Sequence, residues 1–144
     1  MEDLNQWLLL LLKVAGWAQI TLIIGSLGIP TVLEWRSKLS GLSTLTRQMF
    51  WVYSFYIWVT NLCFGLVSAF GAQHLLDSSP LATYVTGFIF GYWFIRMIVQ
   101  WTYFDISEIP QTGFTIVARW ALEILFIGLM LIYLACVLAN LGLI

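Results

Sequence analysis

Four long apolar stretches follow one another along the chain, at residues 5–27, 45–71, 81–104 and 116–138. Each reaches the ~20 residues that an α-helix needs to cross a hydrocarbon core roughly 30 Å thick. The stretches are continuously apolar and too long to be the strands of a β-barrel. The pattern therefore predicts an all-α integral membrane protein, a four-helix bundle of antiparallel spans that forms a single domain over residues 1–144.

The segments between the stretches support these limits. All three prolines lie there, at Pro30, Pro80 and Pro110, and proline is a poor residue for the interior of a helix. The second connection, residues 72–80, is short, as is typical of antiparallel neighbours. The chain starts with the acidic Glu2 and Asp3 rather than the positive charge of a signal peptide, so we expect the first stretch to be a retained span.

The connection between the first two stretches has a helical pattern of its own. Apolar residues recur on one side and charged residues on the other, namely Val32, Trp35, Leu39 and Leu42 against Glu34, Arg36 and Lys38. A short amphipathic helix lying in the membrane interface would show this pattern. An ordinary cytoplasmic extension of the first span would show it equally well.

The composition favours lipid as the solvent of this chain. It is 61% hydrophobic and 9% charged, whereas a soluble domain has about 25% charged residues. The formal net charge is −1 and no basic run is present, so we expect no nucleic-acid partner. In size and number of spans the chain resembles many small four-span bacterial inner-membrane proteins, the DoxX-like proteins among them, and this resemblance implies a location in the bacterial inner (plasma) membrane.

The basic residues are distributed unequally between the two sides of the predicted bundle. Arg36, Lys38 and Arg47 lie in the first connection and Arg119 starts the fourth span, whereas the second connection has neither lysine nor arginine. Connections rich in lysine and arginine remain in the cytoplasm. We therefore expect both termini to lie on the non-cytoplasmic side.

Three charged residues, Lys13, Arg96 and Glu123, fall inside the predicted spans. A charge there costs at least about 2.5–3.5 kcal/mol, so each needs a partner or a hydrated cavity. Arg96 lies eight residues before the end of the third span and Glu123 seven residues after the start of the fourth, at nearly equal depth. We predict that these two side chains are in contact, and that Lys13 extends to the outer headgroups.

Further polar residues extend this candidate intramembrane site. Tyr92, Arg96, Gln100 and Tyr103 form a polar stripe on the third span. Arg119 is one turn before Glu123 on the same helical face and could share its carboxylate. The site has two interpretations: a buried pair that locks spans three and four together, or a site for an anionic lipid headgroup, a quinone or a transported ion.

Several uncharged residues are typical of helix contacts. Gln19 and Asn61 are predicted to form hydrogen bonds between helices. Gly87 with Gly91, and Gly65 with Ala69, have the spacing of small residues that allows two helices to approach closely. These contacts could lie within the bundle or between subunits.

The residues needed for several chemistries are missing. The chain has one histidine, His74, and two separated cysteines, Cys63 and Cys136, too few for a His-based di-iron, bis-His haem or His/Cys zinc site. No glycine-rich phosphate loop and no credible Ser-His-acid arrangement is present. We therefore expect no metal, no cofactor and no catalysis, and we interpret both cysteines as small core residues.

These observations favour a small non-catalytic membrane protein. We expect an accessory or structural subunit whose partners are membrane lipid and other membrane subunits or further copies of itself. The alternatives are a small oligomeric transporter or channel, and a lipid- or quinone-binding membrane component that uses the Arg96 and Glu123 site.

Overall fold

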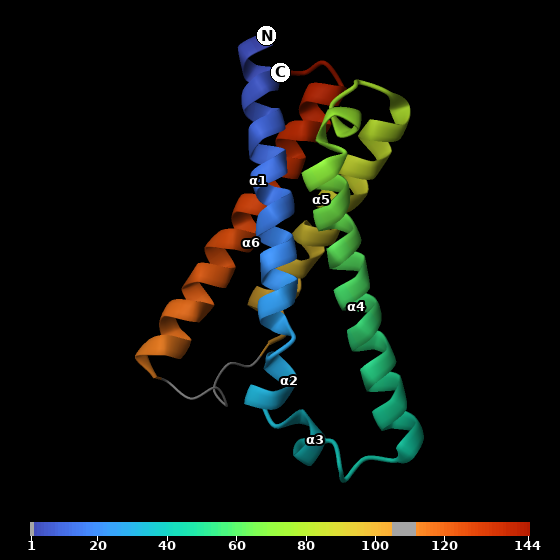
Figure 1. Ribbon diagram of the computed structural model, residues 1–144, viewed down its shortest axis with the longest axis vertical. Coiled ribbons are helices and arrows are strands. Elements are labelled where there is room, and N and C mark those ends of the chain that lie inside the picture. Colours follow the sequence, from blue (N-terminus) through green and yellow to red (C-terminus); the bar gives the residue numbers. More distant parts are fainter. Residues whose placement is uncertain (1, 105–111) are drawn as a thin grey trace. The chain divides into compact units, whose positions relative to one another are not determined.

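The computed structural model describes residues 2–104 and 112–144 (Figure 1). Every regular element in these residues is helical. In chain order they are α1 (Glu2–Ser26), α2 (Ile29–Val32), α3 (Trp35–Lys38), α4 (Thr44–Phe70), the 3-10 helix η1 (Ala72–Leu75), α5 (Pro80–Thr102) and α6 (Gly113–Asn140).

Four of these helical segments are long and apolar enough to cross a membrane. They cover Leu4–Val32, Thr44–Phe70, Pro80–Thr102 and Thr115–Asn140. The predicted all-α fold with four candidate spans is therefore confirmed. The expectation for Pro110 lies outside the described residues.

Hydroxyl side chains cap three of the long helices at their N-termini. Ser43 accepts a hydrogen bond from the Thr46 amide at the start of α4, and Ser79 accepts one from the Ala82 amide at the start of α5. In α6, Thr112 and Thr115 form a reciprocal capping box. The helix therefore begins at Gly113, before the predicted start of the apolar stretch at residue 116. Such caps satisfy amide groups that have no partner within the helix.

The described chain divides into two compact units, each of which has its own packing. The first comprises Met1–Leu12 and Gln73–Ile144. In this unit α5 packs along α6, and the buried residues recur every three or four positions: Ile89, Trp93 and Met97 on α5, with Leu129, Tyr133 and Cys136 on α6. This spacing places the apolar side chains on one face of each helix.

Contacts at the two ends show that α5 and α6 are antiparallel. At the end of α6, Asn140 donates to the carbonyl of Leu75, shortly before α5 begins. Near the end of α5, Trp101 donates to Glu123 in the first half of α6. An antiparallel arrangement of all four spans together remains a prediction.

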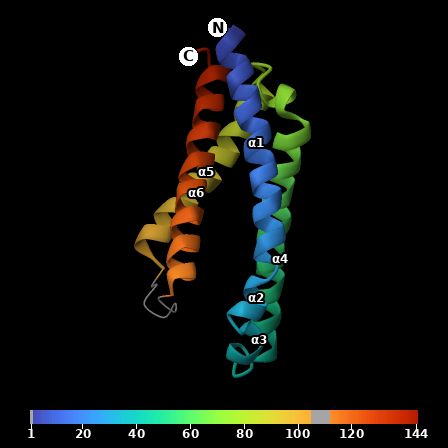
Figure 2. The same cartoon turned by 60° about the vertical axis from the view of Figure 1, so that its left-hand side comes forward.

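The second unit, Lys13–Ala72, places the later part of α1 beside α4 (Figure 2). The two helices meet at Gly16, where an added methyl group would lie 2.8 Å from both Ala69 Cα and Gly65 O. A methyl added at Gly65 would lie 2.9 Å from Ile20 Cγ1. Gly65 and Ala69 therefore line a close helix contact, as their spacing predicts.

The other pair of small residues has no such contact within the described residues. An added methyl at Gly91 would meet nothing within 4 Å, and one at Gly87 would meet only Val137 Cγ2, at 4.0 Å. Among the described residues, the spacing of Gly87 and Gly91 therefore does not correspond to a close backbone approach. A contact between subunits at this position remains a prediction.

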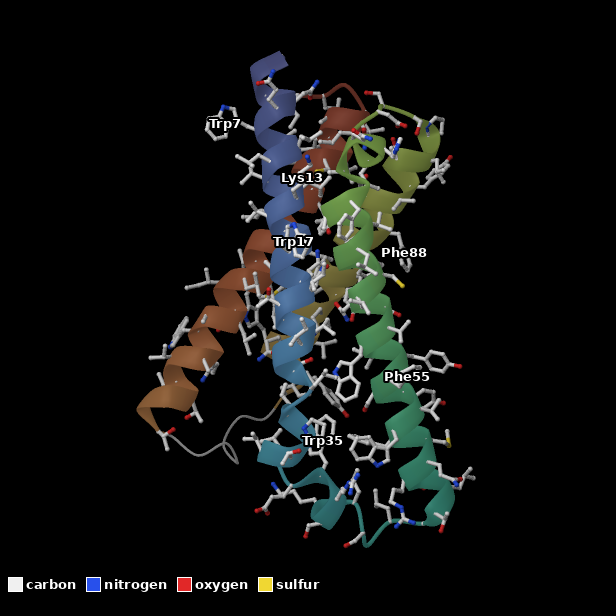
Figure 3. The ribbon with its side chains drawn as sticks, viewed as in Figure 1. Trp7, Lys13, Trp17, Trp35, Phe55 and Phe88 are labelled. Carbon is white, nitrogen blue, oxygen red and sulfur yellow. The ribbon has the colours of Figure 1, made fainter. Side chains whose placement is uncertain are left out.

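The first connection forms two four-residue helices, α2 and α3, rather than one amphipathic helix. Glu34 breaks the run because its backbone is in the left-handed region, with φ 53° and ψ 40°. One residue of the apolar side, Trp35, packs on the start of α4. Its ring meets the Phe50 ring edge-on at 4.9 Å between centroids, and the Trp51 ring at 6.1 Å. Trp35 is labelled in Figure 3. Because the first candidate span continues to Val32, α2 is closer to an extension of that span.

Candidate functional site

Arg96 is half-buried on α5 and has a set of neutral partners. Its Nη1 donates a hydrogen bond of 2.9 Å to Oε1 of Gln100, one turn later on the same helix. Its Cζ lies over the rings of Phe104, at 5.3 Å, and Phe126, at 5.1 Å. The polar stripe predicted on this helix is therefore real at its centre, where it is combined with aromatic rings.

Glu123 has a different partner from the one expected. Its Oε1 accepts a hydrogen bond of 2.6 Å from the indole Nε1 of Trp101. No ion pair joins Glu123 to Arg96 among the residues that the structure describes, so the predicted direct contact is not formed. Trp101 is largely exposed, as an indole at a membrane interface would be.

The reason for this difference is the relative height of the two helices. Phe126 lies level with Arg96, whereas Glu123 lies level with Trp101, five residues further along α5. Three residues of α6 correspond to a rise of about 4.5 Å. Arg96 and Glu123 were predicted at equal depth from the ends of their apolar stretches. That prediction assumes that the ends of neighbouring helices lie at the same level in the membrane.

The remaining candidate residues are dispersed. Tyr92 packs edge-on against Trp93, at 5.5 Å between ring centroids. Tyr103 is 82% exposed at the end of α5. Arg119 is exposed, with its Cζ 5.9 Å from the ring of Trp120, and shares no ion pair with Glu123 in the described residues. Lys13 belongs to the second unit, where it is exposed on α1 (Figure 3).

Trp93 is a component of the site that its sequence position did not reveal. Its ring stacks on Phe126, with centroids 5.2 Å apart and planes 30° apart. The side chain is 2% exposed, and its Nε1–H has no acceptor among the described residues. A buried donor without an acceptor costs about 1–3 kcal/mol. Only the packing of α5 on α6 shows that Trp93, Arg96 and Phe126 form one cluster.

A second polar cluster ties the end of α6 to the connection before α5. Asn140 donates to the Leu75 carbonyl at 2.8 Å and accepts from the Ser78 amide at 3.2 Å. The hydroxyl of Thr86 lies 3.5 Å from Asn140 Nδ2. The polar groups in this cluster form hydrogen bonds with one another, so we assign the cluster a structural role. A single asparagine at the end of a long apolar run was the signal available in the sequence.

The side chains predicted to join helices lie in the second unit. Gln19 and Asn61 are buried, and each donates to the carbonyl four residues earlier in its own helix, Ala15 and Ile57 respectively. Hydrogen bonds from these residues to another helix remain a prediction.

The cysteines and the histidine lie apart from both polar clusters. Cys63 and Cys136 are free thiols; Cys136 is buried, as expected, but Cys63 is exposed on α4. His74 is exposed in η1. In the part of the chain that the structure describes, no three His, Cys, Asp or Glu side chains form a group that could hold a metal ion.

Four helices long and apolar enough to cross a membrane, with one donor-rich polar cluster centred on α5, are compatible with a small multi-pass membrane protein. Comparisons with protein-family models, with curated proteins and with solved structures found no match for this chain. Any more specific function must therefore be inferred from the geometry.

Proposed function

We propose that this chain is a small non-catalytic membrane subunit that packs against the spans of a larger membrane assembly or of further copies of itself. The observation that carries the proposal is the row of large exposed side chains on one face of α4. Only 17% of the most apolar part of this helix is buried. Large side chains project from the helix along that face, and Phe55 stands out from α4 in Figure 3.

The composition of this face supports a protein partner. Phe55 and Tyr56 are both exposed on this face of α4. Tyrosine and phenylalanine are enriched in the contact regions of protein interfaces, where a rigid ring contributes a large area with little loss of conformational entropy. Outside the four long segments, the described residues form only short helices and turns. Such small connections offer little surface for independent activity in water.

Photocrosslinking in the native membrane tests the proposal. A benzophenone amino acid would replace Phe55 on α4, and in a matched chain Phe88, which is exposed on α5. We expect Phe55 to form a defined protein adduct whose mass identifies either a second copy or another membrane protein. Adducts to lipid alone from both positions would contradict the proposal.

The Arg96 cluster favours a second function, binding of a lipid or another small anion. It has hydrogen-bond donors in excess of described acceptors. The two functions are compatible, because the cluster uses side chains of α5 and α6, whereas the subunit contact uses α4.

A further inference from the structure

We propose that Arg96 is the centre of a binding site for a phosphate group, provided by a lipid headgroup or by a soluble phosphate anion. The site consists of Arg96 and the residues against which it lies, Gln100, Phe104 and Phe126, with Trp93 behind Phe126. We call this group the Arg96 patch. The inference requires only that α5 spans a membrane and is independent of the subunit function proposed above.

The direction of the Arg96 side chain brings its charge towards the membrane surface. In an α-helix the Cα–Cβ bonds tilt towards the N-terminus. The guanidinium nevertheless contacts Gln100 and Phe104, which lie four and eight residues towards the C-terminal end of α5. Long basic side chains take this course when their charge extends from the hydrocarbon to the headgroups. Lipid phosphates lie at that level.

The guanidinium has unused donors in this position. It carries five N–H groups in one plane, and Gln100 Oε1 is their one acceptor in the described residues. The other described neighbours of the guanidinium are the rings of Phe104 and Phe126, which its Cζ overlies at 5.3 and 5.1 Å from the ring centroids. Aromatic rings stabilise a cation, but they provide no lone-pair acceptor for its N–H groups.

No described acid compensates the positive charge. Glu123 is the acidic residue of α6, and its described partner is the Trp101 indole. A phosphate group provides negative charge and several acceptor oxygens, and it fits the planar fork of arginine in a bidentate manner. The patch therefore has the charge and the donors that a phosphate requires.

Binding is tested on the full chain purified in a mild non-ionic detergent. Native mass spectrometry would count bound dioleoylphosphatidylglycerol, with dioleoylglycerol as the matched lipid that lacks the phosphate. Inorganic phosphate, added as a competitor, separates the two sources. We expect phosphatidylglycerol to bind at one site per chain and dioleoylglycerol not to bind. Displacement by millimolar phosphate would instead assign the site to the soluble anion.

Two variants assign the binding to Arg96. Arg96→Leu should weaken phosphatidylglycerol binding about tenfold or more, the value of a charged hydrogen-bonded contact. Arg119→Leu removes the same charge from an exposed position on α6 and is the matched control, with an expected change below about twofold. Equal binding by Arg96→Leu and Arg119→Leu would overturn the proposal.

A third variant separates binding from folding. Gln100→Glu places a carboxylate where Arg96 already has its hydrogen bond, so the chain should remain folded and the guanidinium should become neutralised from within. We expect this variant to retain its thermal stability and to lose phosphatidylglycerol binding. A folded Gln100→Glu chain that binds the lipid as well as the wild type would also overturn the proposal.

Discussion

At Gly16 the backbone of α4 leaves no space for a side chain on α1. A β-carbon there would come within 2.8 Å of Gly65 O and Ala69 Cα, both of which are backbone atoms that cannot rotate away. Gly25, in the last turn of the same helix, has open space around the equivalent position. Alanine substitutions at Gly16 and Gly25 can therefore separate the effect of the helix–helix contact from the effect of helix propensity.

We predict opposite effects for alanine at these two glycines. Gly16→Ala should destabilise the chain by about 1–3 kcal/mol, because the helices must move apart. Gly25→Ala should be neutral or should stabilise by up to about 1 kcal/mol, because alanine is the better helix former. Thermal unfolding in detergent micelles measures both. Equal midpoints for the two variants would show that the close contact is not formed.

Asp77 provides a prediction for the pH dependence of the second connection. Hydrogen bonds from the side chain and the backbone amide of Ser79 hold the pKa of this carboxyl below its usual value. Because the pKa is lowered in the folded state, the stabilisation is present above the unfolded-state pKa of about 3.9 and is lost as the pH falls through the folded pKa. Ser79→Ala should raise the pKa of Asp77, as an NMR titration of its carboxyl carbon would show. An unchanged titration would exclude the Ser79 hydroxyl as a cause, because alanine keeps the backbone amide.

Single residues also mark the limit of what sequence patterns could predict about the site. The polar stripe placed Arg96 and Gln100 on one side of the helix at a spacing of four, and in the structure their side chains share a hydrogen bond. The partner of Glu123 was predicted wrongly, because it depends on the vertical offset of two helices. Phe126 and Trp93 were missed because aromatic residues are common along these spans, and only packing selects the ones that meet Arg96.

At the scale of elements, the Asn140 side chain closes the α5 and α6 pair. It satisfies the Leu75 carbonyl and the Ser78 amide, and Ser78 adopts the left-handed backbone conformation with φ 58°. Loss of Asn140 would leave two backbone groups without their partner beside a strained residue. The end of α6 therefore determines the shape of a connection far from it in sequence.

We predict that Asn140→Leu destabilises this unit by about 1–3 kcal/mol for each buried group that loses its partner. Asn140→Asp should have a smaller effect at Ser78, because it keeps the acceptor oxygen. Hydrogen exchange at the Ser78 amide should accelerate in the leucine variant. Asn5→Leu, an exposed position in the same unit, is the control. An unchanged exchange rate at the Ser78 amide would contradict the hydrogen bond between Ser78 and Asn140.

The long elements were predictable and the first connection was not. Apolar length alone located all four candidate spans to within a few residues, because a helix that satisfies its own backbone is the form that a long apolar chain takes in lipid. Of the apolar residues in the pattern of residues 32–42, Trp35 packs on α4, whereas Val32 and Leu42 are exposed. The pattern did not reveal the break at Glu34, because a left-handed conformation at a glutamate depends on its surroundings rather than on its own preference.

At the scale of the whole molecule, the distribution of basic residues leads to a prediction about topology. Arg36, Lys38 and Arg47 precede or begin α4. We expect this side to face the cytoplasm and both termini to face away from it. Reporter fusions at Ile144 and after Ser40 should be active on opposite sides of the membrane. A fusion at Ile144 that is active only in the cytoplasm would reverse the orientation.

The tie between Asn140 and the second connection has a consequence for the time course of synthesis. Ser78 and its acceptor are separated by 62 residues in the chain. At about 5–20 residues per second, the connection emerges roughly 3–12 s before the residue that completes it. During that interval, water at the membrane surface must form the hydrogen bonds of the Leu75 carbonyl and the Ser78 amide. Insertion of the spans and the final ordering of this unit are therefore separate events, and the second waits for the last turn of α6.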